Sequence, residues 1–464
     1  MTISQDSFIF QAKIAEQTPN VIHGEGIHIT VEHQGKTSKL IDGMTGAAVG
    51  GLGWGDPEVH KIINEAAKVS SYSYPSYIGN KHSEALGEYY IKNSPPGAFA
   101  AALWTTSGSE SNENALKLIR QYHLERGNPK KYKFISRKVS YHGFTIGALS
   151  ISSNPRGKDF KPILLPEEQC LKMDVCYPYR YKLEGETMEQ YVNRLLENLE
   201  NLILDNDPET IASVTVETLP GSSLGTSPPP PGYLPGIRKL CNKYDLVFML
   251  DEVMCGTGRA SPNGGFNCWE NYLTPEEGPD IMTIGKVLGS GYVTIAGILV
   301  SPKFRDAFVK GSGYIFGSHT YSGHAFNCAV ALKIQERINE LSLHQNIFEK
   351  GNSMGKKLQL ELADSETVGD VRGIGGFWSI EFVKNKQTKE SFDLKLDICH
   401  RFQDVCFDLG LTVMGNQGCD HGVGDHVSLA PHFIITDEDV SNIVAIVSKA
   451  VKTMEAELKE EGLL

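Results

Sequence analysis

Residues 212–252 have the sequence ASVTVETLPGSSLGTSPPPPGYLPGIRKLCNKYDLVFMLDE, and this stretch decides the fold class. It begins with a strand-like run, ASVTVET, and passes through a glycine- and proline-rich loop into a helix-like stretch, LPGIRKLCNKY. A second apolar run, LVFML, follows and stops at Asp251. Strand, helix and strand in this order, with near-continuous apolar strands, indicate parallel strands whose faces are covered by helices.

The same alternation extends in both directions, from about residue 100 to about residue 300. Upstream, LWTTSG is typical of a strand that ends in a glycine turn, and ESNENALKLIRQYHLERG is typical of a helix. Farther along, Thr187 and Gln190 form a capping box. That box opens a helix with an apolar stripe made of Met188, Tyr191, Leu195, Leu199 and Leu202. We therefore predict an α/β fold with a mostly parallel central sheet covered by helices.

The two ends of the chain differ from this middle region. Residues 27–41 alternate around Gln34 and Gly35, which predicts a β-hairpin. After about residue 330 long helices dominate, with a strand near 376–383 and a final helix from Thr436. We predict a large domain at 61–329, and a smaller α+β domain formed by the N-terminal segment 1–60 together with residues 330–464.

The composition points to a small-molecule enzyme. The chain has 464 residues, of which 40% are apolar and 22% charged, as in ordinary globular proteins. A net charge of −12 disfavours binding to nucleic acid or to anionic lipid. We find neither a targeting segment nor an apolar run long enough to span a membrane. The nine scattered cysteines form no CxxC pair, so we expect reduced thiols in a cytoplasmic protein.

Several common catalytic templates are missing. The chain has no GxGxxG after a strand, no GxxxxGK[ST], no HExxH and no GxSxG. These absences argue against nucleotide-binding and metallohydrolase functions, and we predict no metal site.

Each of the remaining polar residues that could belong to a functional site also has an ordinary structural explanation. SGSE, residues 107–110, follows a strand and opens a helix, so its amides could bind an anion, although Ser109 could simply be the N-cap. Asp251 and Glu217 end strands, where ligands of α/β sheets collect. Lys286, in TIGKVLGSGY (283–292), would in isolation be a solvated surface charge.

Taken in order, these segments resemble one family, the class III pyridoxal-phosphate-dependent aminotransferases, including those that act on ω-amines and β-alanine. The resemblance covers most of the chain. It rests on SGSESNENALKL, YHG, Glu217, LDEVMCGTGR, TIGKVLGSGY and HTYSGH, with Lys286 placed 35 residues (286 − 251) after Asp251. It implies PLP fold type I, with pyridoxal 5'-phosphate bound in the domain at 61–329.

The resemblance also implies a role for each residue. Lys286 would hold the cofactor as a Schiff base and move the substrate proton, Asp251 would keep the ring nitrogen protonated, and Glu217 would lie beside the lysine. The remaining cofactor contacts would come from Ser107, Gly108, Ser109, Tyr141, His142 and Val253. Thr320 would reach the phosphate in the neighbouring subunit, which implies a homodimer with a shared active site.

Two departures from the family pattern concern the cofactor and the substrate. Met254 stands where many relatives have a glutamine. No arginine occurs after Arg401, whereas many relatives use a C-terminal arginine to hold the substrate carboxylate. His421, His426 and His432 lie in that region. Trp54 and Tyr74 could line an apolar amine pocket, or Trp54 could simply pack between the domains.

The resemblance predicts a transaminase that moves an amino group from a primary amine or ω-amino acid to a 2-oxo acid such as pyruvate. A racemase, aminomutase, lyase or decarboxylase would need the same lysine and aspartate. A noncatalytic binding protein is disfavoured because the full set of cofactor residues is present.

Overall fold

The computed structural model describes residues 10, 18–153, 155–418, 420 and 423–464. Its centre is a seven-stranded sheet of order β4-β10-β9-β8-β7-β5-β6. The strands are β4 (Ala101–Thr105), β5 (Lys133–Arg137), β6 (Cys170–Met173), β7 (Ile211–Glu217), β8 (Val247–Asp251), β9 (Ile281–Ile284) and β10 (Ala296–Val300). All neighbours pair in parallel except β10, which is antiparallel to both β9 and β4. The predicted mostly parallel sheet is confirmed.

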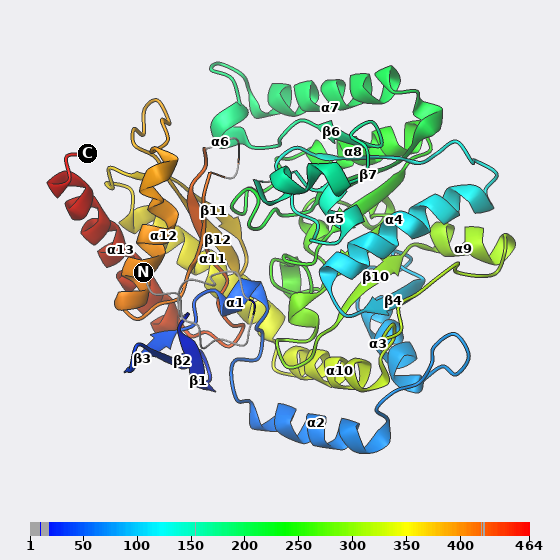
Figure 1. Cartoon of the computed structure of the whole chain (residues 1–464), viewed down its shortest axis with the longest axis horizontal. Coiled ribbons are helices and arrows are strands. Elements are labelled where there is room, and N and C mark those ends of the chain that lie inside the picture. Colours follow the sequence, from blue (N-terminus) through cyan, green and yellow to red (C-terminus); the bar gives the residue numbers. More distant parts are fainter. Residues whose placement is uncertain (1–9, 11–17, 154, 419, 421–422) are drawn as a thin grey trace.

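Helices cover both faces of this sheet (Figure 1). One face packs on α4 (Gly108–Glu125) and α9 (Pro302–Lys310). The other face packs on α3 (Lys81–Lys92), α7 (Met188–Asp205), α8 (Tyr233–Lys243) and α10 (Ala325–Glu340). Residues of β8 alternate between the two cores, Met249 with the first and Phe248 with the second, as the two-residue period of a strand requires.

Local signals in the sequence match the observed ends of the elements. The capping box of Thr187 and Gln190 is present at the start of α7. Tyr191, Leu195 and Leu199 are buried along the helix, but Met188 is exposed because it occupies the first helical position, beyond the edge of the core.

Two smaller sheets lie beside the large one, toward the left of Figure 1. The first contains β1 (Asn20–Glu25), β2 (His28–His33) and β3 (Lys36–Ile41), so the predicted hairpin is present and β1 extends it. The second has the order β11-β12-β14-β13. Its strands are β11 (Val368–Ile374), β12 (Phe377–Phe382), β13 (Met414–Asn416) and β14 (His426–Leu429). Three helices pack in the same region: α11 (Leu343–Glu361), α12 (Ile398–Asp408) and α13 (Asp437–Glu460).

Residues from both ends of the chain share one core. Ile27, Leu52 and Val59 belong to the same buried cluster as Phe382, Phe402 and many other C-terminal side chains. The domain boundaries at 60 and 330 stay a prediction.

The remaining elements are short connections, apart from α2. They comprise α1 (Thr45–Ala48), α2 (Pro57–Val69), α5 (Ile146–Ile151), α6 (Pro178–Tyr181) and the 3-10 turns η1 (Pro155–Ile163), η2 (Pro208–Thr210), η3 (Pro262–Gly264), η4 (Cys268–Asn271), η5 (Pro275–Glu277), η6 (Lys286–Leu288) and η7 (Leu394–Leu396). The eight cysteines in the described ranges are buried, and none is paired with another of them in a disulfide. No helix among the described residues has the length and apolar content that a membrane span requires.

Candidate active site

Strand register brings the main polar residues together at one edge of the large sheet. Glu217 pairs with Asp251 across β7 and β8, and Asp251 pairs with Thr283 across β8 and β9. Because these strands are parallel, their carboxyl ends meet at the same edge, which is where α/β sheets bind ligands.

A cavity of about 410 Å³ lies at this edge. Nine residues singled out in the sequence line it: Ser107, Gly108, Ser109, Tyr141, His142, Glu217, Asp251, Val253 and Lys286. The lining also includes Met254, Asn112 and the segment 291–295. The volume is within the range of small-molecule and cofactor sites.

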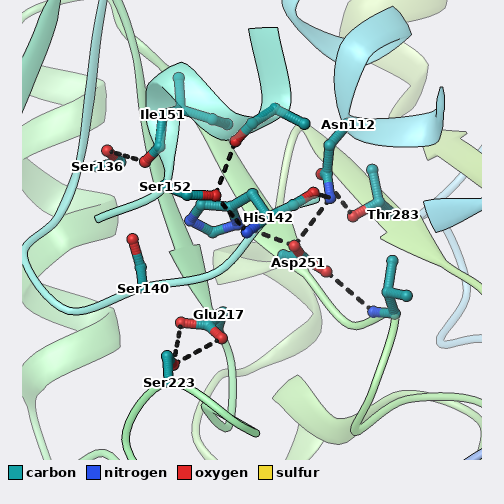
Figure 2. A network of polar contacts seen from close by, with 12 residues as sticks. Asn112, Ser136, Ser140, His142, Ile151, Ser152, Glu217, Ser223, Asp251 and Thr283 are labelled. Carbon is teal, nitrogen blue, oxygen red and sulfur yellow. Dashed lines mark hydrogen bonds and ion pairs between the residues drawn. The ribbon is translucent and has the colours of Figure 1, made fainter. Parts of the chain in front are cut away.

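Asp251 lines this cavity. Figure 2 shows the polar contacts that hold its carboxylate. Its Oδ2 lies 2.8 Å from His142 Nδ1 and accepts from Asn112 Nδ2 at 2.9 Å. Its Oδ1 accepts from the backbone N–H of Val253 at 3.0 Å. His142 is itself positioned because its backbone N–H donates to Ser152 Oγ at 2.8 Å. The carboxylate is thus buried, and three hydrogen bonds fix its orientation.

Asn112 is a site residue that the motif comparison missed. Its amide nitrogen donates to Asp251 and to the carbonyl of His142, while its Oδ1 accepts from Thr283 Oγ1 at 3.1 Å. The sequence contained a signal for it, because Asn112 lies four residues after Gly108 and therefore on the same face of α4.

Lys286 follows β9 directly and begins η6. Its backbone φ is +48°, in the left-handed region that non-glycine residues rarely adopt. Such strain is concentrated at functional sites. Burial lowers the pKa of Lys286 from its ordinary value of 10.5; the nearby Asp251 carboxylate opposes this effect and the Arg156 guanidinium adds to it. The preceding Gly285 is tightly packed, because a Cβ there would lie 3.3 Å from both Val253 and Ala296.

Glu217 forms a buried ion pair that the sequence did not reveal. Arg137 Nη2 donates to Glu217 Oε2 at 2.9 Å, and Ser223 Oγ donates to Oε1 at 3.0 Å. Burial raises the pKa of Glu217, and the Arg137 charge opposes that rise. Arg137 ends β5 and Ser223 lies in the loop after β7, so only the folded sheet brings them to Glu217.

The N-terminus of α4 closes another side of the cavity. Ser107 is the N-cap, with its Oγ accepting from Glu110 N at 3.2 Å, so the alternative that Ser109 caps the helix is wrong. Ser109 Oγ instead accepts from Phe144 N at 3.0 Å. Gly108 is needed for packing, since a Cβ there would lie 2.6 Å from Val253 Cγ1. The amides of Gly108 and Ser109 precede the first backbone hydrogen bond of the helix, from Ser111 N to Ser107 O, and form a positive end suited to an anion.

Three predicted residues lie outside the cavity lining. Thr320 is exposed, and its carbonyl accepts from Tyr72 Oη at 3.1 Å. Tyr74 is 56% exposed. Trp54 contacts the N-terminal region instead. Its Nε1 donates to Asp42 Oδ2 at 2.8 Å, and its ring packs against Gly24, where a Cβ would clash with it.

Two of the three C-terminal histidines, His426 and His432, are buried. His426 is buried beside Gly225, and burial lowers its pKa to about 4. His432 is buried and lies 3.4 Å from Asp42. His421 lies outside the described residues.

The cavity's chemistry fits pyridoxal phosphate. The cofactor has a phosphate, a basic ring nitrogen and an aldehyde, and the cavity offers a helix N-terminus, a buried carboxylate and an amine for these three groups. One ligand of this kind would satisfy all three features.

Comparison with known proteins gives a consistent result. The profile of the family described as Aminotransferase class-III matches residues 12–451. An uncharacterised aminotransferase of Schizosaccharomyces pombe is 34% identical over 456 residues, covering 97% of this chain and 96% of the relative. Gamma aminobutyrate transaminase 2 of Solanum lycopersicum is 33% identical, and the match covers 91% of this chain and 89% of the relative. The crystal structure of an omega transaminase from Pseudomonas jessenii in complex with PMP matches with a TM-score of 0.87 at 29% identity. The match covers 95% of this chain and 94% of that structure.

Proposed function

This chain belongs to the class-III aminotransferases, and we propose that it moves an amino group from a primary amine or ω-amino acid to a 2-oxo acid such as pyruvate, with Lys286 as the catalytic residue. It is a pyridoxal-phosphate-dependent aminotransferase. The proposed site is supported chiefly by one observation: Lys286, Asp251 and the N-terminus of α4 line the same cavity.

We assign the cofactor contacts from this geometry. Ser107, Gly108 and Ser109 would bind the phosphate at the start of α4. Asp251 would hold the protonated ring nitrogen, because its carboxylate is buried and oriented by three donors. Val253 and Tyr141 would confine the two faces of the ring. When bound, pyridoxal phosphate supplies an electron sink for the electrons left behind when a Cα proton departs.

Lys286 would bind the cofactor and then carry the proton. A lysine can act as a nucleophile or general base only when its amine is neutral. Burial lowers the pKa of Lys286 and so increases its neutral fraction at a given pH. The backbone conformation at φ +48° directs this side chain from the end of β9 into the cavity.

Glu217 would stand on the substrate side of Lys286. Arg137 and Ser223 fix its carboxylate, so its position is set before a ligand arrives. Preorganised charge of this kind contributes to catalysis without reorganisation during the reaction.

The relatives favour a donor with a terminal amino group. One is named a gamma aminobutyrate transaminase and a solved structure is an omega transaminase. Met254, an apolar residue in the cavity lining, would face such a donor or the cofactor ring.

We also propose a homodimer with a shared active site. Large apolar side chains are exposed near Thr320, a feature typical of a protein interface. They include Tyr72, Tyr74, Tyr77, Ile78, Tyr314, Ile315, Phe316 and Tyr321. Burial of this surface by a second copy would bring Thr320 to the phosphate of the partner's cofactor. The buried cysteines of the described ranges, which form no disulfide with one another, fit a reducing compartment, and we propose a cytoplasmic location.

A donor screen on the holoenzyme tests the function. Amines and ω-amino acids are mixed with the protein, and conversion of the cofactor to its amino form is followed by absorbance. Pyruvate is then added and alanine is measured. Amino-form cofactor followed by alanine supports the proposal. Substrate turnover without a 2-oxo acid, with the cofactor always in its aldehyde form, would favour a racemase or lyase instead.

A further inference from the structure

Lys172 lies in β6, the edge strand of the large sheet, and its amine lies among backbone carbonyls. We propose that Lys172 is a positioning residue of the reaction, which holds the end of α5 and thereby sets the orientation of Asp251. The effect passes through Ser152 and His142, because Lys172 lies outside the lining of the cavity of about 410 Å³. This inference rests on the proposed function, in which Asp251 holds the ring nitrogen of the cofactor.

Four oxygen atoms accept hydrogen bonds from the Lys172 amine. Three are the backbone carbonyls of Ser150, Ile151 and Ser152, at 3.1, 2.7 and 3.0 Å from Nζ. The fourth is Ser136 Oγ at 2.8 Å, and Ser136 is fully buried in β5. An ammonium group has three N–H donors and no acceptor, so its three hydrogens are shared among these four oxygens.

The three carbonyls belong to the C-terminal end of α5 (Ile146–Ile151). The last carbonyls of a helix have no partners within it, and a positive charge beside them is stabilising. Ser136 adds a second contact from the sheet, because its Oγ donates to the Ile151 carbonyl at 2.6 Å (Figure 2). A helix of six residues is not stable alone in water, so contacts such as these decide where the end of α5 lies.

Ser152 connects the end of α5 to the cavity. Its Oγ accepts from the backbone N–H of His142 at 2.8 Å, and His142 Nδ1 lies 2.8 Å from Asp251 Oδ2. Figure 2 shows both contacts. Ser140 and Ser153 exchange two backbone hydrogen bonds, of 3.0 and 2.9 Å, so the segments that carry His142 and Ser152 run side by side. A shift at the end of α5 would therefore displace the imidazole that orients Asp251.

The Lys172 amine loses its charge in mildly alkaline solution. Burial lowers its pKa to about 8, and interactions with Cys170 and Glu167 oppose this effect. Lys158 and Lys161 line a second cavity, of about 880 Å³, together with Lys172, and Lys161 pairs with Glu167 at 2.9 Å. A neutral amine has two N–H donors and a lone pair, and the lone pair repels a carbonyl oxygen. The end of α5 is therefore held less firmly as the pH rises above about 8.

Lys131 is a matched control, because its amine is held in the same way at the opposite edge of the sheet. Its Nζ donates to the carbonyls of Pro208, Ile211 and Tyr244, at 3.1, 3.2 and 3.1 Å. Lys131 is buried, and burial lowers its pKa as well. Ile211 begins β7, whereas Glu217, at the end of β7, lines the cavity. Replacing Lys131 therefore removes a buried cation with similar contacts at a place remote from α5.

Affinity for pyridoxal phosphate, measured with and without Asp251→Asn, tests the inference. The protein is freed of cofactor and titrated with pyridoxal phosphate. The variants are Lys172→Met, Lys131→Met and Asp251→Asn, and each lysine variant combined with Asp251→Asn. A residue that acts through Asp251 loses its effect once Asp251 is replaced, whereas an independent structural loss is additive. Unfolding in urea measures the stability of each variant separately.

We expect Lys172→Met to raise the dissociation constant about tenfold at pH 7, as for the loss of one hydrogen bond to a charged group. In the Asp251→Asn background the same change should have less than about a twofold effect. Lys131→Met should have this small effect in both backgrounds, whatever it does to stability. At pH 9 the wild type should approach Lys172→Met, because its own Lys172 has lost the charge.

Lys172→Arg keeps its charge at both pH values, so the ratio of its dissociation constant to that of the wild type should fall between pH 7 and pH 9. This comparison tests the inference even where Lys172→Met does not fold. An equal loss in both backgrounds, an equal loss in Lys131→Met or a constant ratio for Lys172→Arg would overturn the inference and leave the proposed function intact. Wild-type affinity of Asp251→Asn alone would contradict the proposed function, and the inference with it.

Discussion

His142 Nδ1 lies 2.8 Å from Asp251 Oδ2, and both side chains are buried. Among the described residues, His142 Nε2 has no hydrogen-bond partner, which leaves Asp251 as the side-chain contact that orients the ring. Under the proposed assignment, the imidazole would act on the cofactor through Asp251, as a positioning residue for that carboxylate.

Replacing His142 should weaken this positioning. A hydrogen bond to a charged group contributes roughly 1.5–3 kcal/mol, which corresponds to about 10–150-fold in rate. We expect His142→Leu to lose activity in that range, whereas His142→Asn, whose amide can donate from nearly the position of Nδ1, should lose less. Single-turnover rates with one donor measure both. Equal loss in the two variants would mean that the ring fills space and does not orient Asp251.

Gly108 should prove essential for cofactor binding. An alanine Cβ would lie 2.6 Å from Val253 Cγ1 and force α4 or Val253 to shift. We expect Gly108→Ala to raise the dissociation constant for pyridoxal phosphate about tenfold, equivalent to ~1.4 kcal/mol. Gly87→Ala in α3 is the matched control, because its Cβ would meet Ala102 at an ordinary 3.7 Å. Tight binding by Gly108→Ala would contradict the assigned phosphate site.

The buried pair of Arg137 and Glu217 should matter for stability. Its side chains are 3% and 8% exposed, and removing one partner from a buried pair costs about 3–5 kcal/mol. We expect Arg137→Met to lower the free energy of unfolding by about this amount in urea titrations. Arg305→Met breaks an exposed pair with Asp306 and should cost less than about 1 kcal/mol. Similar losses in the two variants would show that burial of the pair is unimportant.

Cofactor capture by the apoenzyme should depend on pH through Lys286. Only the neutral amine reacts, so the capture rate rises as pH increases through its pKa. Because burial lowers this pKa, the midpoint should fall below the ordinary 10.5. Arg156 also lowers the pKa and Asp251 raises it, so Arg156→Gln should move the midpoint up and Asp251→Asn should move it down. Stopped-flow absorbance reads the rate. A midpoint at or above 10.5 would refute a buried, activated lysine.

The central sheet was predictable because its strands are continuous apolar runs that end in turn residues. Because β7, β8 and β9 are parallel neighbours, their register places Glu217, Asp251 and Thr283 at one edge of the sheet. β1 was not predicted, because its residues are mostly exposed and show no alternation of apolar and polar side chains.

The hydrogen-bond and ion-pair partners of the site residues were harder to predict from the sequence. Arg137 precedes Glu217 by 80 positions, and Asn112 precedes Asp251 by 139. Spacing along a chain says nothing about such contacts unless the sheet order is known.

Reduction with borohydride tests the account most directly, because it makes the bond between a lysine and the cofactor permanent. The holoenzyme is reduced, digested and mapped by mass spectrometry. The account predicts that the cofactor is attached to Lys286, and that Lys286→Ala shows no attachment and loses the visible absorbance of the lysine-bound form. Attachment to another lysine, or survival of that absorbance in Lys286→Ala, would contradict it.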